Sequence, residues 1–99
     1  MNISLCIPRV KNIYTNTFIY NIINKYKIGE IEDIAIIKKK NFNKIYINFY
    51  YWYSDNDRNN KIFKHLTNDG SIKIFYSEPY FWNCYKAEPK RKIKYNYKQ

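Results

Sequence analysis

The sequence predicts an α+β domain in which two helices pack on an antiparallel β-sheet. Residues 44–50 carry apolar side chains at every second position, which is typical of a strand with one buried face. Two other segments, around residues 18–26 and 62–66, carry apolar side chains at three- and four-residue spacing, which predicts helices. The length of 99 residues suffices for one domain with a single hydrophobic core.

The strand at residues 44–50 has two faces with different expected roles. Ile45, Ile47 and Phe49 point into the core on one face. The other face carries polar and amphipathic side chains, so we expect functional residues there: Lys44, Tyr46, Asn48 and Tyr50.

An earlier strand and the first helix precede this segment. Ser4–Ile7 alternates as a short strand with Cys6 on the face opposite to Leu5 and Ile7, and we expect Pro8 to close it, because proline cannot donate a ladder hydrogen bond. Either Thr15 or Thr17 can cap the helix that follows. We expect Gly29 to end that helix in a left-handed conformation.

A second strand is expected from Ile31 to Lys38, with Ile34 and Ile36 facing the core. The polar turn after it contains Lys38, Lys39 and Lys40, which have two open interpretations: a solvated loop, or a clamp for phosphate groups. The second helix takes its cap from residues 54–57, and residues 68–70 stop it.

The chain then forms a hairpin and a tail. Residues 71–76 and 80–87 are extended runs joined by a turn at 77–79. If Trp82 and Cys84 point inward on the last strand, Tyr85 lies on the open face. From residue 88 the chain is polar and basic, which divides it into a domain at residues 1–87 and a basic tail at 88–99 with Lys90, Arg91 and Lys92.

The order of elements is strand, helix, strand, strand, helix, strand, with one extra hairpin strand before the last. This order is typical of the ferredoxin-like β-α-β-β-α-β fold. It predicts a four-stranded antiparallel sheet with the first and third strands at its centre, two helices on one face, and the extra hairpin strand. The other face of the sheet is then open.

The net charge of +10 favours an acidic partner such as nucleic acid. A compositional explanation is also open. Asn, Lys, Ile and Tyr, which AT-rich codons encode, make up 58 of the 99 residues. Even an unselected positive charge attracts polyanions without specificity.

Several function classes find no support in the sequence. It has no apolar run long enough to span a bilayer and no signal-peptide pattern, so we expect an intracellular protein without a membrane partner. Cys6 and Cys84 lack companions at metal-ligand spacing and are expected to be reduced thiols. Paired carboxylates, a nucleophile motif and a phosphate-binding glycine loop are absent, so we expect no enzyme, metal or cofactor; His65 is expected at the surface.

Two segments resemble the RNA recognition motif (RRM) family. Leu5-Cys6-Ile7-Pro8-Arg9-Val10 lies where the family carries its shorter signature, and residues 42–49 lie where it carries the longer one. Residues 44–53, followed by residues 72–82 with their Glu-Pro-aromatic-aromatic-Trp segment, look like the small RRM-like proteins of large nucleocytoplasmic DNA viruses. The resemblance implies an RRM-like fold over about residues 3–87, viral origin, and a location in the host cytoplasm, the virus factory or the virion.

The resemblance also implies an RNA-binding face. The family's base-stacking aromatics map to Cys6, Lys44 and Tyr46, of which only Tyr46 is aromatic. Each stacked base contributes about 1–3 kcal/mol, so the two departures forfeit about 2–6 kcal/mol. Lys44 can recover part of this through a phosphate contact.

Two functions follow as alternatives. In the first, single-stranded RNA or another single strand binds with low sequence specificity on Tyr46, Tyr50 and Tyr85. Its phosphates are neutralised by Arg9, Lys44, the turn at 38–40 and the basic tail. In the second, the open face or the aromatic hairpin docks a protein partner or a second copy, because an aromatic patch rimmed by lysines also suits protein contacts.

Overall fold

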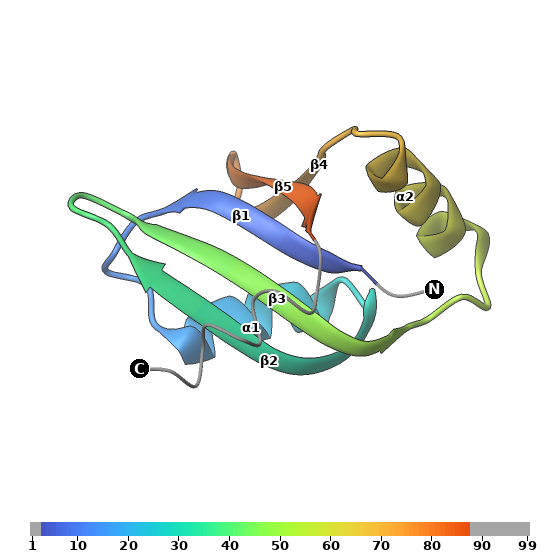
Figure 1. The fold of residues 1–99 in the computed structure, drawn as a ribbon, viewed down its shortest axis with the longest axis horizontal. Coiled ribbons are helices and arrows are strands. Elements are labelled where there is room, and N and C mark those ends of the chain that lie inside the picture. The colour runs from blue at the N-terminus through green and yellow to red at the C-terminus, as the bar shows by residue number, and fades with distance from the viewer. Residues whose placement is uncertain (1–2, 88–99) are drawn as a thin grey trace.

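The computed structural model describes residues 3–87, which form two helices and five strands (Figure 1). All strand pairs are antiparallel, and the strand order in the sheet is β2-β3-β1-β5-β4. The α+β class predicted from the sequence is therefore confirmed. The elements are β1 (Ser4–Val10), α1 (Asn16–Lys25), β2 (Gly29–Lys38), β3 (Asn43–Trp52), α2 (Asp57–Thr67), β4 (Ile72–Ser77) and β5 (Tyr80–Ala87).

The sheet has one strand more than the four expected. The predicted extra hairpin strand is β4, which pairs with β5 from Ile72 opposite Cys84 to Ser77 opposite Tyr80. It thereby becomes the edge of a five-stranded sheet, next to β5. β1 and β3 lie inside the sheet, as the sequence predicted.

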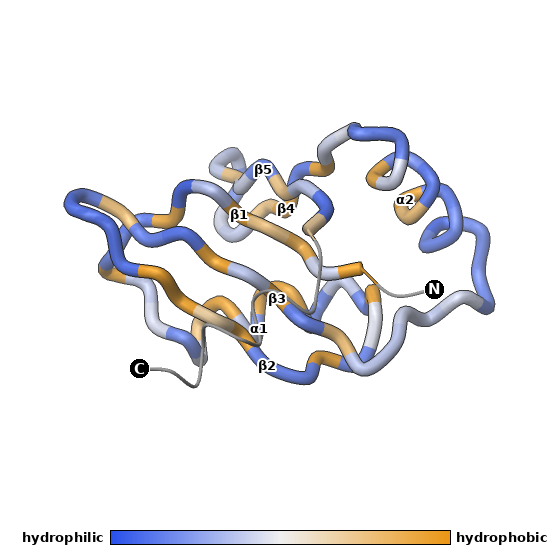
Figure 2. Tube along the Cα trace, viewed as in Figure 1, coloured by the Kyte–Doolittle hydropathy of each residue, from blue (hydrophilic) through white to orange (hydrophobic). Residues whose placement is uncertain are grey.

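One hydrophobic core joins both helices to the sheet. Leu5, Ile7, Ile45 and Ile47 are fully buried in it, together with Leu66 of α2. Figure 2 shows hydrophobic and hydrophilic residues alternating along β2 and β3, as strands with unlike faces require. Ile34 and Ile36 pack against this core and Trp82 lies in it, which confirms their predicted positions; Trp52 lies in it as well.

The two helices occupy different positions relative to the sheet. In Figure 1, α1 lies behind β2 and β3, whereas α2 lies beyond the ends of β1 and β5. Asn59 at the start of α2 is 1% exposed, and its Nδ2 donates to the carbonyls of Lys27 (2.9 Å) and Tyr53 (3.0 Å). Arg58 donates to the carbonyls of Tyr26 and Lys27. These two side chains fix α2 to the connection between α1 and β2. No helix within residues 3–87 has the length and apolarity needed to cross a membrane.

Both helices begin at predicted caps. The Thr15 Oγ1 accepts a hydrogen bond from the Phe18 N–H at 3.1 Å, and the Asn56 Oδ1 accepts one from the Asn59 N–H at 2.8 Å. The prediction that Gly29 ends α1 is wrong. The helix ends at Lys25, Lys27 adopts the left-handed conformation with φ 53°, and Gly29 is the first residue of β2.

The prediction that Pro8 closes the first strand is also wrong. β1 continues to Val10, and its pairing with β3 changes register between Ile7 and Val10. On its other side, the pairing of β1 with β5 stops at Cys6 opposite Tyr85. Proline is tolerated at such an irregularity because no ladder partner needs its missing N–H.

Candidate nucleic-acid interface

Side chains of four strands form one row across the sheet. Tyr46 pairs with Ala35 on one side and with Cys6 on the other, and Cys6 pairs with Tyr85. Directly paired residues lie on the same face, so we call Tyr46, Cys6 and Tyr85 the tyrosine row. Two strand spacings separate its two rings by about 10 Å. Tyr85 is 42% exposed and Tyr46 is half-buried. The row therefore offers two aromatic rings on either side of a small thiol side chain.

Lys44 lies next to this row on β3. Its Nζ is 5.5 Å from the centroid of the Tyr46 ring. The hydrogen bond to Tyr46, together with the electrostatic attraction of the same phenol, raises the pKa of the Lys44 ammonium. Lys44 is therefore a cation at neutral pH that lies beside an aromatic ring, where it can contact a phosphate of a strand that stacks on Tyr46.

The prediction that Asn48 binds a ligand is not supported by its surroundings. Asn48 is 1% exposed. Its Oδ1 accepts a hydrogen bond from the Ser4 Oγ at 2.5 Å, and its Nδ2 donates to the Asp33 Oδ1 at 2.6 Å. Because a buried amide must satisfy its polar atoms internally, Asn48 links three strands instead of facing solvent.

Tyr50 is 62% exposed but lies outside the regular alternation of β3. Ile31 pairs with Phe49 and Glu30 pairs with Tyr51, so Tyr50 is the extra residue of a bulge. The parity argument that placed Tyr50 beside Tyr46 therefore stops at Phe49.

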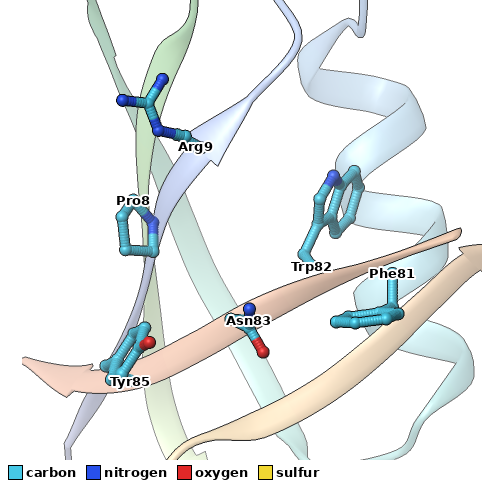
Figure 3. Close-up of a pocket in the computed structure, with 6 residues that line it drawn as sticks. All are labelled: Pro8, Arg9, Phe81, Trp82, Asn83 and Tyr85. Atoms are coloured by element: carbon cyan, nitrogen blue, oxygen red, sulfur yellow. The ribbon is translucent and has the colours of Figure 1, made fainter.

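A groove opens where β1 and β5 separate (Figure 3). It consists of two adjoining pockets of about 320 and 300 Å³, which share Arg9, Phe81 and Trp82. We call it the Arg9 groove. The remaining lining residues of the first pocket are Pro8, Asn83 and Tyr85. Those of the second are Val10, Lys11, Asn41, Phe42 and Tyr76.

The groove follows from the pairing of the two strands. β1 and β5 pair only from Ser4 opposite Ala87 to Cys6 opposite Tyr85. Beyond Cys6, β5 pairs with β4 alone. In Figure 3, Pro8 and Arg9 lie on one side of the resulting gap, and Phe81 and Trp82 lie on the other. Tyr85, the last residue before the gap, belongs to both the tyrosine row and the groove.

The structure brings Arg9 close to the lysine turn. The Arg9 guanidinium carbon lies 4.2 Å from the centroid of the Phe42 ring. The Phe42 carbonyl accepts a hydrogen bond from the Lys39 N–H at 2.9 Å, which closes the turn. Lys38, Lys39 and Lys40 are exposed there. The other predicted basic residues, Lys90, Arg91 and Lys92, lie outside the described residues.

Charge varies along β2, at the other edge of the sheet. Its first half carries the exposed acidic residues Glu30, Glu32 and Asp33, and its last residue is Lys38. A polyanion is repelled by the first half and attracted by the end that leads to the turn. The part of the surface that is electrostatically favourable for a polyanion therefore extends from the tyrosine row towards the Arg9 groove.

Several groove residues were not among the predicted site residues. Phe81 is 38% exposed, and the Nζ of Lys73 lies 4.9 Å from its ring centroid. The alternation that placed Tyr85 on the open face also places Phe81 and Asn83 there, so that signal was present in the sequence. The separation of the strands had no comparable signal apart from Pro8.

No protein-family model, no curated protein and no solved structure matches this chain. Within residues 3–87, His, Cys, Asp and Glu side chains form no group of three that could hold a metal ion. Cys6 and Cys84 are both buried.

Proposed function

We propose that this protein is a small RRM-like module that binds single-stranded nucleic acid with low sequence specificity, and that RNA is its main ligand. The observation that carries the proposal is the continuity of the tyrosine row, Lys44 and the Arg9 groove. Aromatic rings beside a basic groove are the combination by which proteins hold single strands.

The strand order supports the RRM-like part of the proposal. Without the edge strand β4, the order β2-β3-β1-β5 is the one that a ferredoxin-like fold has. The resemblance of residues 44–53 and 72–82 to viral RRM-like proteins adds the proposal of viral origin and of a site of action in the host cytoplasm, virus factory or virion.

The residues on the row favour modest affinity. Tyr46 and Tyr85 can each stack one base for about 1–3 kcal/mol, whereas Cys6 between them cannot stack. Lysine contacts to phosphate add affinity without reading sequence. We therefore expect binding that weakens steeply with salt and differs little between sequences.

The test is fluorescence anisotropy with short single-stranded RNA and DNA oligonucleotides over a salt series. We expect Tyr46→Ala to weaken binding about 5- to 150-fold, which corresponds to one lost stack. Tyr20→Ala is the matched control, because Tyr20 is an exposed tyrosine on α1. Equal affinity of the Tyr46→Ala variant and the unmodified protein would contradict the proposal.

A protein-docking function is the second candidate, favoured by exposed aromatic residues outside the row. Tyr50, Tyr51 and Tyr80 are 62%, 54% and 63% exposed. Exposed tyrosines are enriched at protein interfaces. Sedimentation velocity tests self-association: a monomer at all concentrations, with oligonucleotide binding intact, counts against a second copy as the partner.

A further inference from the structure

We infer that the Arg9 groove receives one unstacked nucleobase of a bound single strand, with Asn83 at the base edge and Arg9 at the adjoining phosphate. The inference rests on the proposed function and adds a pocket with base discrimination to it. Binding in this pocket differs from base stacking on the sheet face, because the pocket lies where β1 and β5 separate.

The walls of the first pocket suit a planar ring. Its volume of about 320 Å³ lies at the lower end of the range of small-molecule sites. Phe81 and Tyr85 are partly exposed and present ring surface to it, and Pro8 faces them from β1 (Figure 3). Base stacking on such aromatic side chains needs no particular base.

Asn83 supplies the polar group that can discriminate between bases. It lies between Phe81 and Tyr85 on β5, is exposed, and lines the first pocket. Its amide makes no hydrogen bond with the residues that the structure describes, in contrast to the buried amides of Asn48 and Asn59. An amide offers both a donor and an acceptor, as the edge of a base requires.

The charges around the groove suit the phosphate of a nucleotide. Arg9 lines both pockets and Lys11 lines the second, while none of the lining residues is acidic. Lys73 lies over the Phe81 ring, and the turn with Lys38–Lys40 adjoins the groove through Phe42. A guanidinium can bind a phosphate with two parallel hydrogen bonds.

Continuity with the tyrosine row selects a nucleic acid as the occupant. Tyr85 belongs to both surfaces, so a strand that stacks on Tyr85 reaches the groove directly. The carboxylates of an acidic peptide match the basic charges of the groove, but they neither stack on its aromatic walls nor pair with the Asn83 amide as a base edge does.

The experiment follows the indole N–H signals of the full chain by NMR during addition of each of the four ribonucleoside 5′-monophosphates. Trp82 lines the groove, whereas the Trp52 Nε1 donates to the Ile3 carbonyl at 2.9 Å and serves as the internal reference. We expect the Trp82 signal to move, the Trp52 signal to stay, and the four nucleotides to differ in affinity. Inorganic phosphate and an oligoglutamate peptide are added separately. An equal shift of Trp82 with either of these, or no shift with any nucleotide, overturns the inference.

Variants test the two roles separately. Asn83→Ala is expected to reduce the differences in affinity among the four nucleotides. Phe81→Ala is expected to weaken the binding of all four about 5- to 150-fold. Phe81→Leu keeps apolar bulk without a ring and is expected to behave like Phe81→Ala. Tyr80→Ala is the matched control, because Tyr80 is 63% exposed and does not line the groove. Unchanged nucleotide affinities in Asn83→Ala and Phe81→Leu contradict the inference.

Oligonucleotide binding distinguishes the two proposals. If Tyr46→Ala weakens oligonucleotide binding and Phe81→Leu does not, the base pocket is wrong and the proposed function stands. If oligonucleotides do not bind the unmodified protein at all, the proposed function fails, and the pocket within a strand-binding surface fails with it.

Discussion

Asn48 shows how a single residue can belong to the architecture of a sheet face and not to its ligand. Its amide joins Ser4 of β1 to Asp33 of β2 through two short hydrogen bonds. Ser4 and Asn48 are both buried. The amide therefore fixes the relative positions of three strands directly beside the tyrosine row.

We expect Asn48→Ala to lower the free energy of unfolding by about 2 kcal/mol, because it leaves the buried Ser4 hydroxyl without its acceptor. Urea unfolding followed by circular dichroism measures this change. Asn83→Ala is the control and should change stability by less than about 0.5 kcal/mol, because Asn83 is exposed. Equal stabilities of the two variants would show that the hydrogen bonds of Asn48 with Ser4 and Asp33 contribute nothing to the free energy of unfolding.

At the scale of elements, the junction between α1 and β2 depends on close backbone approach. Gly29 begins β2 opposite Trp52. A Cβ atom at this position would lie 2.4 Å from the Tyr51 carbonyl oxygen and 3.0 Å from the Trp52 Cα. Backbone atoms cannot move away as the end of a side chain can. Glycine is therefore required at position 29 because the backbones of β2 and β3 approach closely there, and not because of a left-handed turn.

The two glycines of the chain form a matched pair. We expect Gly29→Ala to destabilise the fold by at least about 2 kcal/mol, because strand pairing must shift to admit the methyl group. At Gly70 the three atoms nearest to an added Cβ all belong to the ring of His65, an exposed side chain that can move away. Gly70→Ala should therefore cost less than about 1 kcal/mol. Thermal unfolding compares the two variants, and a larger loss at Gly70 would refute this account.

At the scale of the whole molecule, one core connects every layer, and Cys84 lies within it. Cys84 is fully buried. Burial, assisted by the nearby Cys6, raises the pKa of the Cys84 thiol above its ordinary value of 9.0. The folded state thus keeps this thiol protonated at a pH at which the unfolded chain releases the proton.

This difference predicts the direction of a pH effect. The contribution of Cys84 to stability is complete below pH 9.0 and is lost as the pH rises above that value. The expected slope is up to about 1.4 kcal/mol per pH unit. Urea unfolding between neutral and alkaline pH measures it. In Cys84→Ala this part of the decline should be absent, while the titration of tyrosines and lysines remains in both proteins. Parallel stability curves for the two proteins would contradict the burial of an uncharged thiol.

Local patterns predicted the elements well because each depends on neighbours in the sequence. The cap at Thr15 and the cap within residues 54–57 follow from side chains that bond to a backbone N–H three residues away. The inward positions of Ile45, Trp82 and Cys84 follow from the alternation of their strands. The errors at Gly29, Pro8 and Asn48 have one origin, since each residue's role is set by a strand that is distant in sequence.

The sequence by itself determined the α+β class, the order of the elements and the outward position of Tyr85, because period-two and helical patterns are properties of adjacent residues. The tertiary structure alone decided that Asn48 is buried, that Tyr50 lies in a bulge, and that Arg9 shares a groove with Phe81. Those outcomes depend on the register between strands and on where β1 and β5 part. Register is set by the packing of the complete core, so no segment of the chain specifies it alone.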